Sequence, residues 1–225
     1  MKSYLNYDKA ILFDLDGTLV DNVSLITESW NIAMIKNNLP YRFSDEDLTK
    51  HMGLTPTESS LLAFKDVSLN QGLKYFSLCL KEEIEYLKTH GGKLYPLERR
   101  VLDTLSSYFP LFIVSNSDKG YIENFINIFH FQNYFVDHLC AGDTSKDKFK
   151  NILIIKDKYN IKDVTYIGDT LKDYKEASKA KVHFIHARYG FGDIIENVDY
   201  IESLSDLLVR LEDINLGKEK NIWKK

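Results

Sequence analysis

A short apolar run that ends in two acids constrains this chain more than any other feature. The run 10–13 is followed directly by Asp14, Asp16, Gly17 and Thr18. An unbroken apolar run of this length is typical of a strand that is covered on both faces, and the Gly-Thr pair lets the chain turn sharply after it. Ligands of open parallel α/β sheets bind at the carboxyl ends of the strands, so both acids are expected at a ligand-binding edge.

The two acids are expected to face one small space. Alternation along a strand directs Asp14 and Asp16 to the same side. Two carboxylates at close range are unfavourable unless a cation or a shared proton lies between them. A plain helix N-cap accounts for one of the acids but not for the pair.

Strand-like runs recur along the chain and alternate with helical patterns. They cover residues 9–13, 111–114, 135–139, 164–167 and 182–185. Between the later runs, segments 119–131 and 148–159 carry apolar residues at helical spacing. This alternation predicts an α/β fold, with a Rossmann-like parallel sheet core flanked by helices.

The long stretch between the first two strand-like runs shows helical patterns only. It contains a capping box from Thr55 to Glu58, with Pro56 at the first helical position, and its last helical pattern ends at 91–92, a Gly-Gly pair. A crossover between parallel strands usually needs one helix, so the extra helices indicate an inserted subdomain. We therefore expect residues 21–91 to form an all-helical cap over the strand ends of an α/β core made by residues 1–20 and 92–225.

Two further strand ends carry groups that could complete a site with Asp14. Asp169 follows the fourth run and Asp173 lies one helical turn later; hard oxygen ligands around one point favour Mg²⁺. Alternatively, Asp169 caps its helix and Asp173 is a surface acid. Ser115 and Asn116 follow the second run and could donate hydrogen bonds to a phosphoryl oxygen, although both residue types are also common in turns.

The order of these groups along the chain resembles the haloacid dehalogenase-like hydrolase superfamily, over essentially the whole chain. The DxDGT motif of that family matches residues 14–18, its Ser or Thr after an apolar strand matches Ser115, and its GDxxxD motif matches residues 168–173. The position of the helical insert resembles the cap of the phosphoglycolate phosphatase and β-phosphoglucomutase branch.

The lysine of the family's third motif is the loosest match, because the Lys-Pro pair of many members is missing here. Both Lys146 and Lys148 lie in the expected loop. We prefer Lys146, because it lies three residues before Phe149, the first core position of the next helix, as in related members. A surface position is the default for an isolated lysine.

The resemblance implies a role for each of these residues. Asp14 would be the nucleophile that forms an aspartyl-phosphate, and Asp16 would act first as general acid and then as general base. The Mg²⁺ cofactor would be held or oriented by Asp14, Asp16 through its backbone carbonyl, Asp169 and Asp173. The phosphoryl oxygens would be held by Ser115, Asn116 and Lys146.

These roles favour a magnesium-dependent phosphatase that acts on a small phosphorylated metabolite. The acid at Asp16 favours phosphate esters over dehalogenase or phosphonatase chemistry. A sugar phosphomutase of the β-phosphoglucomutase type is the alternative, although the segment after Gly53 lacks the basic residues that would hold a second phosphate. A phosphate-binding module without turnover is a third possibility. Substrate specificity is expected from the cap residues Lys50, His51, Gly53 and Thr55.

Composition excludes several other classes of protein. The net charge is −4, and basic residues gather only near the end, in Lys218 to Lys225, so nucleic acid has no electrostatic footing. No apolar run approaches the roughly 18 residues of a membrane span, and a secretion signal is not apparent. We expect a cytoplasmic protein, a monomer or weak homodimer, with Cys79 and Cys140 buried and reduced.

Overall fold

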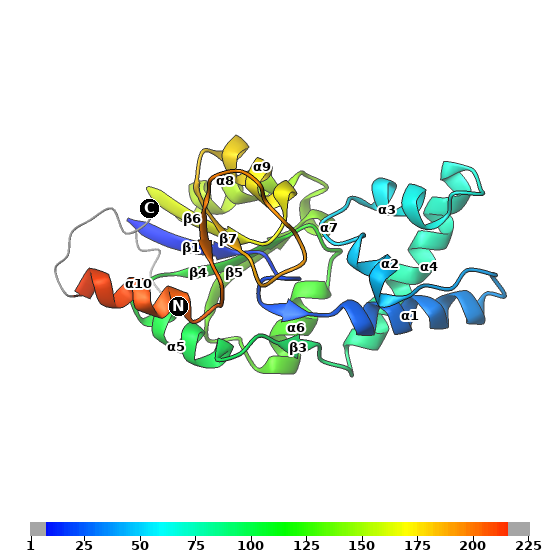
Figure 1. The fold of residues 1–225 in the computed structure, drawn as a ribbon, viewed down its shortest axis with the longest axis horizontal. Coiled ribbons are helices and arrows are strands. Elements are labelled where there is room, and N and C mark those ends of the chain that lie inside the picture. The colour runs from blue at the N-terminus through cyan, green and yellow to red at the C-terminus, as the bar shows by residue number, and fades with distance from the viewer. Residues whose placement is uncertain (1–7, 216–225) are drawn as a thin grey trace.

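The computed structural model describes residues 8–215, so the basic segment 218–225 lies outside the described residues. Its main feature is a six-stranded sheet in the order β5-β4-β1-β6-β7-β8 (Figure 1). The strands are β1 (Lys9–Phe13), β4 (Leu111–Ser115), β5 (Phe135–Cys140), β6 (Asp163–Gly168), β7 (His183–Ala187) and β8 (Asp199–Ile201). Every neighbouring pair is parallel, which confirms the predicted α/β fold.

The central strand β1 fixes where the functional groups leave the sheet. Phe13 pairs with Ile113 of β4 on one side and with Ile167 of β6 on the other. The backbone N–H of Asp14 extends the sheet by donating to the carbonyl of Ile167 at 2.8 Å. The residues that follow these three strands therefore emerge side by side at one edge.

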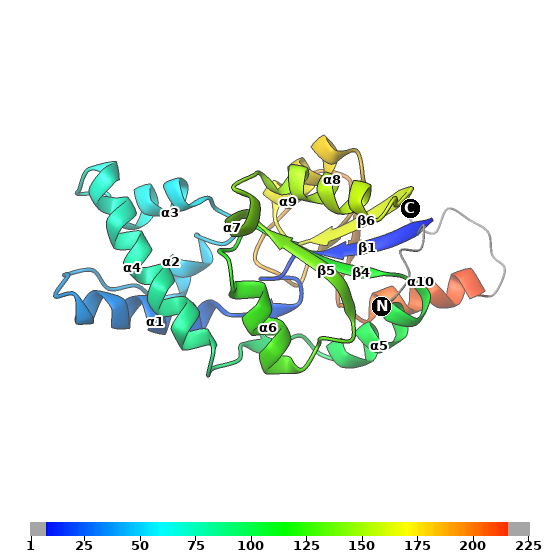
Figure 2. The same ribbon diagram turned by 180° about the vertical axis from the view of Figure 1, so that it is seen from behind.

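Helices cover both faces of the sheet (Figures 1 and 2). One face carries α8 (Lys148–Lys158) and α9 (Leu171–Ala180), and the other carries α5 (Glu98–Tyr108), α6 (Tyr121–Phe129) and α10 (Asp206–Asn215). Side chains that alternate along β1 enter the two layers in turn: Leu12 packs under α8 and α9, and Phe13 packs on the opposite side. Burial on both faces explains why β1 is apolar throughout from residue 10 to residue 13.

Four helices lie together beyond the carboxyl edge of the sheet, and we call them the helical insert. They are α1 (Val23–Lys36), α2 (Asp45–Thr49), α3 (Pro56–Ala63) and α4 (Leu69–Leu87). They enclose a hydrophobic cluster of their own, in which Trp30 and Met34 of α1 lie with Phe76 of α4. Helix α3 starts at the predicted capping box, where the Thr55 hydroxyl accepts from the backbone N–H of Glu58.

Short elements mark where the sequence patterns are too brief to predict structure. Strands β2 (Val20–Asp21) and β3 (Lys93–Leu94) pair antiparallel where the chain enters and leaves the helical insert. Neither they nor β8 are expected from the sequence, because two or three residues show no periodicity. The one-turn helix α7 (Ala141–Thr144) follows β5.

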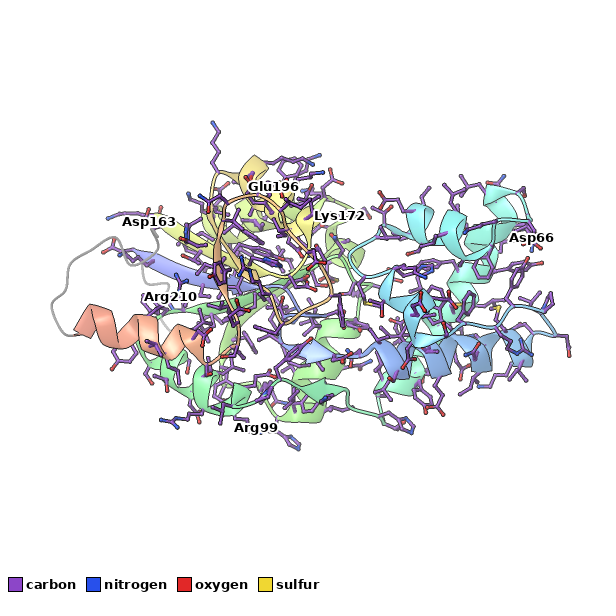
Figure 3. All side chains as sticks on the ribbon, viewed as in Figure 1. Asp66, Arg99, Asp163, Lys172, Glu196 and Arg210 are labelled. Carbon is purple, nitrogen blue, oxygen red and sulfur yellow. The ribbon has the colours of Figure 1, made fainter. Side chains whose placement is uncertain are left out.

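Side chains fill the spaces between these elements, and the charged residues labelled in Figure 3, such as Asp66 and Arg99, lie around the outside. Lys172 of α9 faces the helical insert and forms a 2.9 Å ion pair with Glu58 of α3. Cys79 and Cys140 are buried and unpaired by disulfides, as expected. Within residues 8–215, no helix is long and apolar enough to cross a membrane.

Candidate active site

Three buried acids meet at the ends of β1 and β6. Asp14, Asp169 and Asp173 each offer a carboxylate oxygen within 4.8 Å of the others. One oxygen of Asp169 accepts the backbone N–H of Phe191 at 2.7 Å, while its Oδ1 is buried without a hydrogen-bond partner among the described residues. A buried carboxylate oxygen without a donor beside two more acids fits a hard divalent cation such as Mg²⁺.

Lys148, rather than Lys146, reaches these acids. Its Nζ lies 2.9 Å from Oδ1 of Asp14 and 2.5 Å from Oδ1 of Asp173, and its side chain is 1% exposed. Lys146, the lysine preferred from the sequence, is exposed and does not line the cavity described below, so the structure does not bring it to these acids. Helix α8 begins at Lys148, whose side chain is directed inward, and the two acids offset the cost of burying the ammonium group.

The cluster contains three acids but only one lysine among the described residues. Burial raises the pKa of Asp14 to about 7, with repulsion from Asp173 acting in the same direction and Lys148 opposing it. Burial, Asp173 and Asp14 likewise hold the pKa of Asp169 well above its usual range. Negative charge on Asp14 and Asp169 is therefore unfavourable until a cation joins them.

Asp173 is already fully engaged by its neighbours. Burial disfavours its charged form, but Lys148 and the hydrogen bonds from Thr170 keep its pKa below the ordinary value. Its Oδ2 accepts both the backbone N–H and the hydroxyl of Thr170, and its Oδ1 faces Lys148. With both oxygens occupied, Asp173 is suited to holding Lys148 and orienting the site.

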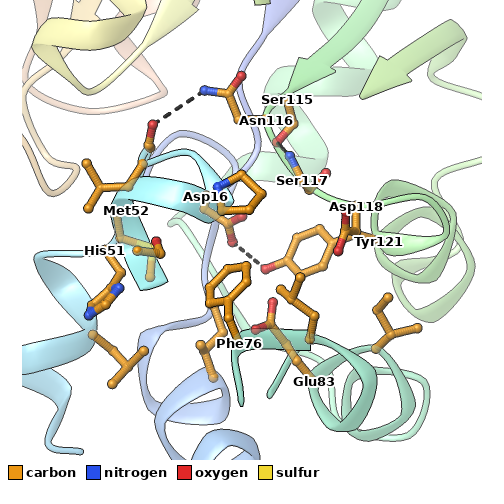
Figure 4. A pocket seen from close by; sticks show the side chains of 18 of the residues that line it. Asp16, His51, Met52, Phe76, Glu83, Ser115, Asn116, Ser117, Asp118 and Tyr121 are labelled. Carbon is orange, nitrogen blue, oxygen red and sulfur yellow. Dashed lines mark hydrogen bonds between the residues drawn. The ribbon is translucent and has the colours of Figure 1, made fainter. Parts of the chain in front are cut away.

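Asp16 lies apart from the three-acid cluster. Its Oδ1 accepts the Tyr121 hydroxyl at 2.8 Å (Figure 4). The same oxygen also accepts the Asn22 side-chain amide at 3.0 Å. Burial raises its pKa to about 6, and these two hydrogen bonds oppose the rise. Neither residue is predicted from the sequence. Tyr121 has the pattern of a helix core position, and Asn22 has that of a turn residue.

Gly17 lets the Asp169 carboxylate lie close against the backbone of the loop after β1. Its φ is +79°, a left-handed conformation that favours glycine, and a Cβ there would collide with the Asp169 carboxylate and the Phe191 ring. The absence of a side chain at Gly17 therefore allows Asp169 to occupy its place in the site.

We expect Gly17→Ala to destabilise the fold by about 1–3 kcal/mol and to lower activity strongly, because the alanine must displace Asp169. Urea unfolding and a turnover assay measure the two effects. Replacing Gly120, whose Cβ position has nothing within 4 Å although its φ is also positive, gives the backbone control. Equal losses of activity at both positions would contradict the role of Gly17.

The edge of β4 contributes the predicted polar groups. Ser115 and Asn116 line the same cavity as Asp14 and Asp16, and Ser115 is buried. The Asn116 side-chain amide donates to the carbonyl of Gly53 at 3.5 Å, a contact between the core and the helical insert (Figure 4).

The insert residues predicted to control specificity are only partly at the cavity. His51 and Gly53 line it. Lys50 is exposed and pairs with Glu46 at 3.0 Å on the surface, and Thr55 is used to cap α3. The structure therefore does not bring Lys50 and Thr55 to the cavity, since the surface ion pair and the helix cap engage their polar groups.

Comparison with known proteins agrees with this arrangement. Residues 11–187 match the family model described as haloacid dehalogenase-like hydrolase, and the chain belongs to that family. The match confirms the resemblance drawn from the sequence and the expectation that the chain is a hydrolase.

Several relatives of low identity are phosphoglycolate phosphatases. A phosphoglycolate phosphatase of Vibrio parahaemolyticus is 25% identical over 226 residues, which cover 89% of this chain and 94% of the relative. The phosphoglycolate phosphatase of Aquifex aeolicus is 25% identical over 214 residues, covering 91% and 97%. The structure of a predicted phosphoglycolate phosphatase from Haemophilus somnus has the same fold, with a TM-score of 0.77, 20% identity and coverage of 91% and 98%.

Proposed function

We propose that the chain is a magnesium-dependent phosphatase that hydrolyses a small phosphorylated metabolite through an aspartyl-phosphate, with the helical insert as its cap. The observation that carries this proposal is the meeting of Asp14, Asp169 and Lys148 at the edge where Ser115 ends β4. The names of the relatives point to the same reaction type. The cavity between this edge and the insert is where a phosphate ester would enter.

Asp14 and Asp169 would hold Mg²⁺ through their carboxylates, together with the backbone carbonyl of Asp16. When bound, the ion offsets the repulsion between Asp14 and an anionic phosphate. Asp173 would act indirectly, because it fixes Lys148 beside Asp14.

In the first step, an Asp14 oxygen attacks phosphorus and the bond from phosphorus to the ester oxygen breaks. Asp16 gives its proton to the departing oxygen. In the second step, Asp16 takes a proton from water as the water oxygen attacks phosphorus. The bond to Asp14 then breaks, and inorganic phosphate leaves.

Polar groups around Asp14 would hold the phosphoryl group through both steps. Ser115 and Asn116 would donate hydrogen bonds to its oxygens, and Lys148 would balance the charge that develops on it. Tyr121 and Asn22 hold Asp16 while its proton moves.

Removal of metal tests this proposal. We expect phosphate release from a panel of phosphate monoesters to stop when a chelator removes Mg²⁺ and to return when Mg²⁺ is added. Asp169→Ala should lower the apparent affinity for Mg²⁺ by at least about tenfold, because it removes a carboxylate ligand. Activity that resists the chelator would contradict the metal assignment.

The same panel separates hydrolysis from phosphomutase activity. A hydrolase releases inorganic phosphate, whereas a mutase converts a hexose 1-phosphate to its 6-phosphate after priming by a bisphosphate. We favour the hydrolase, because Lys148 is the only lysine or arginine among the described residues that line the cavity. A second phosphate would have no cation of its own to bind.

A further inference from the structure

The cavity extends from the candidate active site into the helical insert, and its far wall is apolar and aromatic. The insert contributes Trp30, Leu48, Phe76, Leu80 and Ile84 to this wall. The rings of Trp30 and Phe76 meet edge to face, with centroids 5.4 Å apart. Such a wall suits the carbon skeleton of a leaving group and, through its aromatic faces, an organic cation.

One carboxylate interrupts this apolar wall. Glu83 of α4 is 6% exposed and lines the cavity, near Tyr121 (Figure 4). Its Oε2 accepts the indole N–H of Trp30 at 2.7 Å. A neutral amide would satisfy that N–H without burying an ionisable group, so the carboxylate needs a further explanation.

Burial of Glu83 has an energetic cost that a positive ligand would recover. Burial raises the pKa of Glu83 to about 8, and repulsion from Asp16 and Asp118 adds to the rise. Both of those acids also line the cavity. A cation placed among them would favour ionised Glu83 and gain a charge-assisted hydrogen bond.

The cavity lacks a free positive group among the described residues that could bind a second anion. Lys148 is already shared between Asp14 and Asp173. His51 packs against Trp30, with ring centroids 5.2 Å apart, and burial lowers its pKa to about 4, so it is neutral at physiological pH. A carboxylate or second phosphate on the leaving group would therefore meet acids rather than bases.

We propose that the substrate is a phosphate monoester of an amino alcohol, whose ammonium group binds Glu83 beside the rings of Trp30 and Phe76. This inference rests on the proposed phosphatase function and names its substrate class. The phosphate would occupy the edge with Asp14, and the amine would lie on the insert side of the cavity.

Esters of matched size test the inference. Aminoethyl, hydroxyethyl and carboxymethyl phosphate differ mainly in the terminal group, and longer members of each series adjust the reach to Glu83. We expect kcat/KM for the best amino ester to exceed that of its hydroxyl counterpart by about tenfold or more, with the carboxylate slowest. A preference for the hydroxyl or carboxylate series overturns the inference.

Variants of α4 assign the preference to Glu83. Glu83→Gln keeps an acceptor for the Trp30 N–H but loses the charge, so the ratio of kcat/KM for amino over hydroxyl esters should fall about tenfold. Glu85→Gln, on the exposed side of the same helix, should leave the ratio unchanged. A ratio that does not fall in Glu83→Gln overturns the role of Glu83.

The panel also separates this inference from the proposed function. If the wild-type protein with Mg²⁺ releases no phosphate from any ester, including p-nitrophenyl phosphate, the phosphatase proposal fails. If it releases phosphate without preferring amines, only the substrate inference fails. The ester series on the wild-type protein decides this even if Glu83→Gln does not fold.

Discussion

Asp14→Asn is expected to abolish phosphate release, with a loss of at least about a thousandfold in kcat. The amide oxygen and nitrogen of asparagine cannot form the aspartyl-phosphate, although the side chain has nearly the same shape. Its oxygen can still accept from Lys148, which lies 2.9 Å from Asp14. The fold should persist, because the substitution removes an acid whose charged form burial already disfavours.

The control for this substitution is Asp163→Asn. Asp163 is exposed at the amino end of β6, the opposite end from the active site (Figure 3). Phosphate release from p-nitrophenyl phosphate, together with circular dichroism of both variants, separates loss of chemistry from loss of fold. Turnover of Asp14→Asn near that of the wild type would exclude the covalent mechanism and favour a module that binds phosphate without catalysis.

The sheet is predictable from sequence because its strands are buried on both faces. β1 and β4 are continuous apolar runs, and their observed bounds differ from the predicted ones by one residue at most. β2, β3 and β8 are not predictable, since each is held by pairing with a distant segment rather than by a pattern of its own. The start of α3 is predictable because its capping box is a local signal.

In the candidate site, too, residues marked by a local pattern are predictable, and those that depend on distant segments are not. Asp14 and Asp169 directly follow β1 and β6, and Ser115 ends β4. The order of these strands brings the three residues together, so local motifs are sufficient to find them. Lys146 and Lys148 are indistinguishable by local pattern, because the choice depends on where α8 begins and on acids contributed by β1 and α9.

Glu83 is missed for a different reason. The helical pattern of α4 identifies the apolar positions around it, and a charged residue there is usually assigned to the solvent side. The one signal that could have found it is an acid at helical spacing between Phe76 and Leu87, both of which are buried. Its hydrogen bond with Trp30 joins α4 to α1, which are distant in sequence, so no local pattern predicts it.

The position of Lys148 beside Asp14 and Asp173 leads to the second large expected effect. Lys148→Met should lower phosphate release at least about a hundredfold, because it removes the cation beside Asp14 that would balance charge on the phosphoryl group. It should also destabilise the fold by about 3 kcal/mol, since Asp14 and Asp173 would remain buried without their shared partner.

Lys146→Met is the matched control, because it makes the same change two residues earlier at an exposed position. We expect its activity and its urea unfolding curve to match those of the wild type, as removal of a surface lysine has little energetic effect. Lys148→Met is to be assayed well below its own unfolding midpoint, so that lost activity reports on chemistry. If Lys146→Met were the inactive variant and Lys148→Met were active, the geometry would be contradicted, because Lys148, and not Lys146, lies within reach of Asp14 and Asp173.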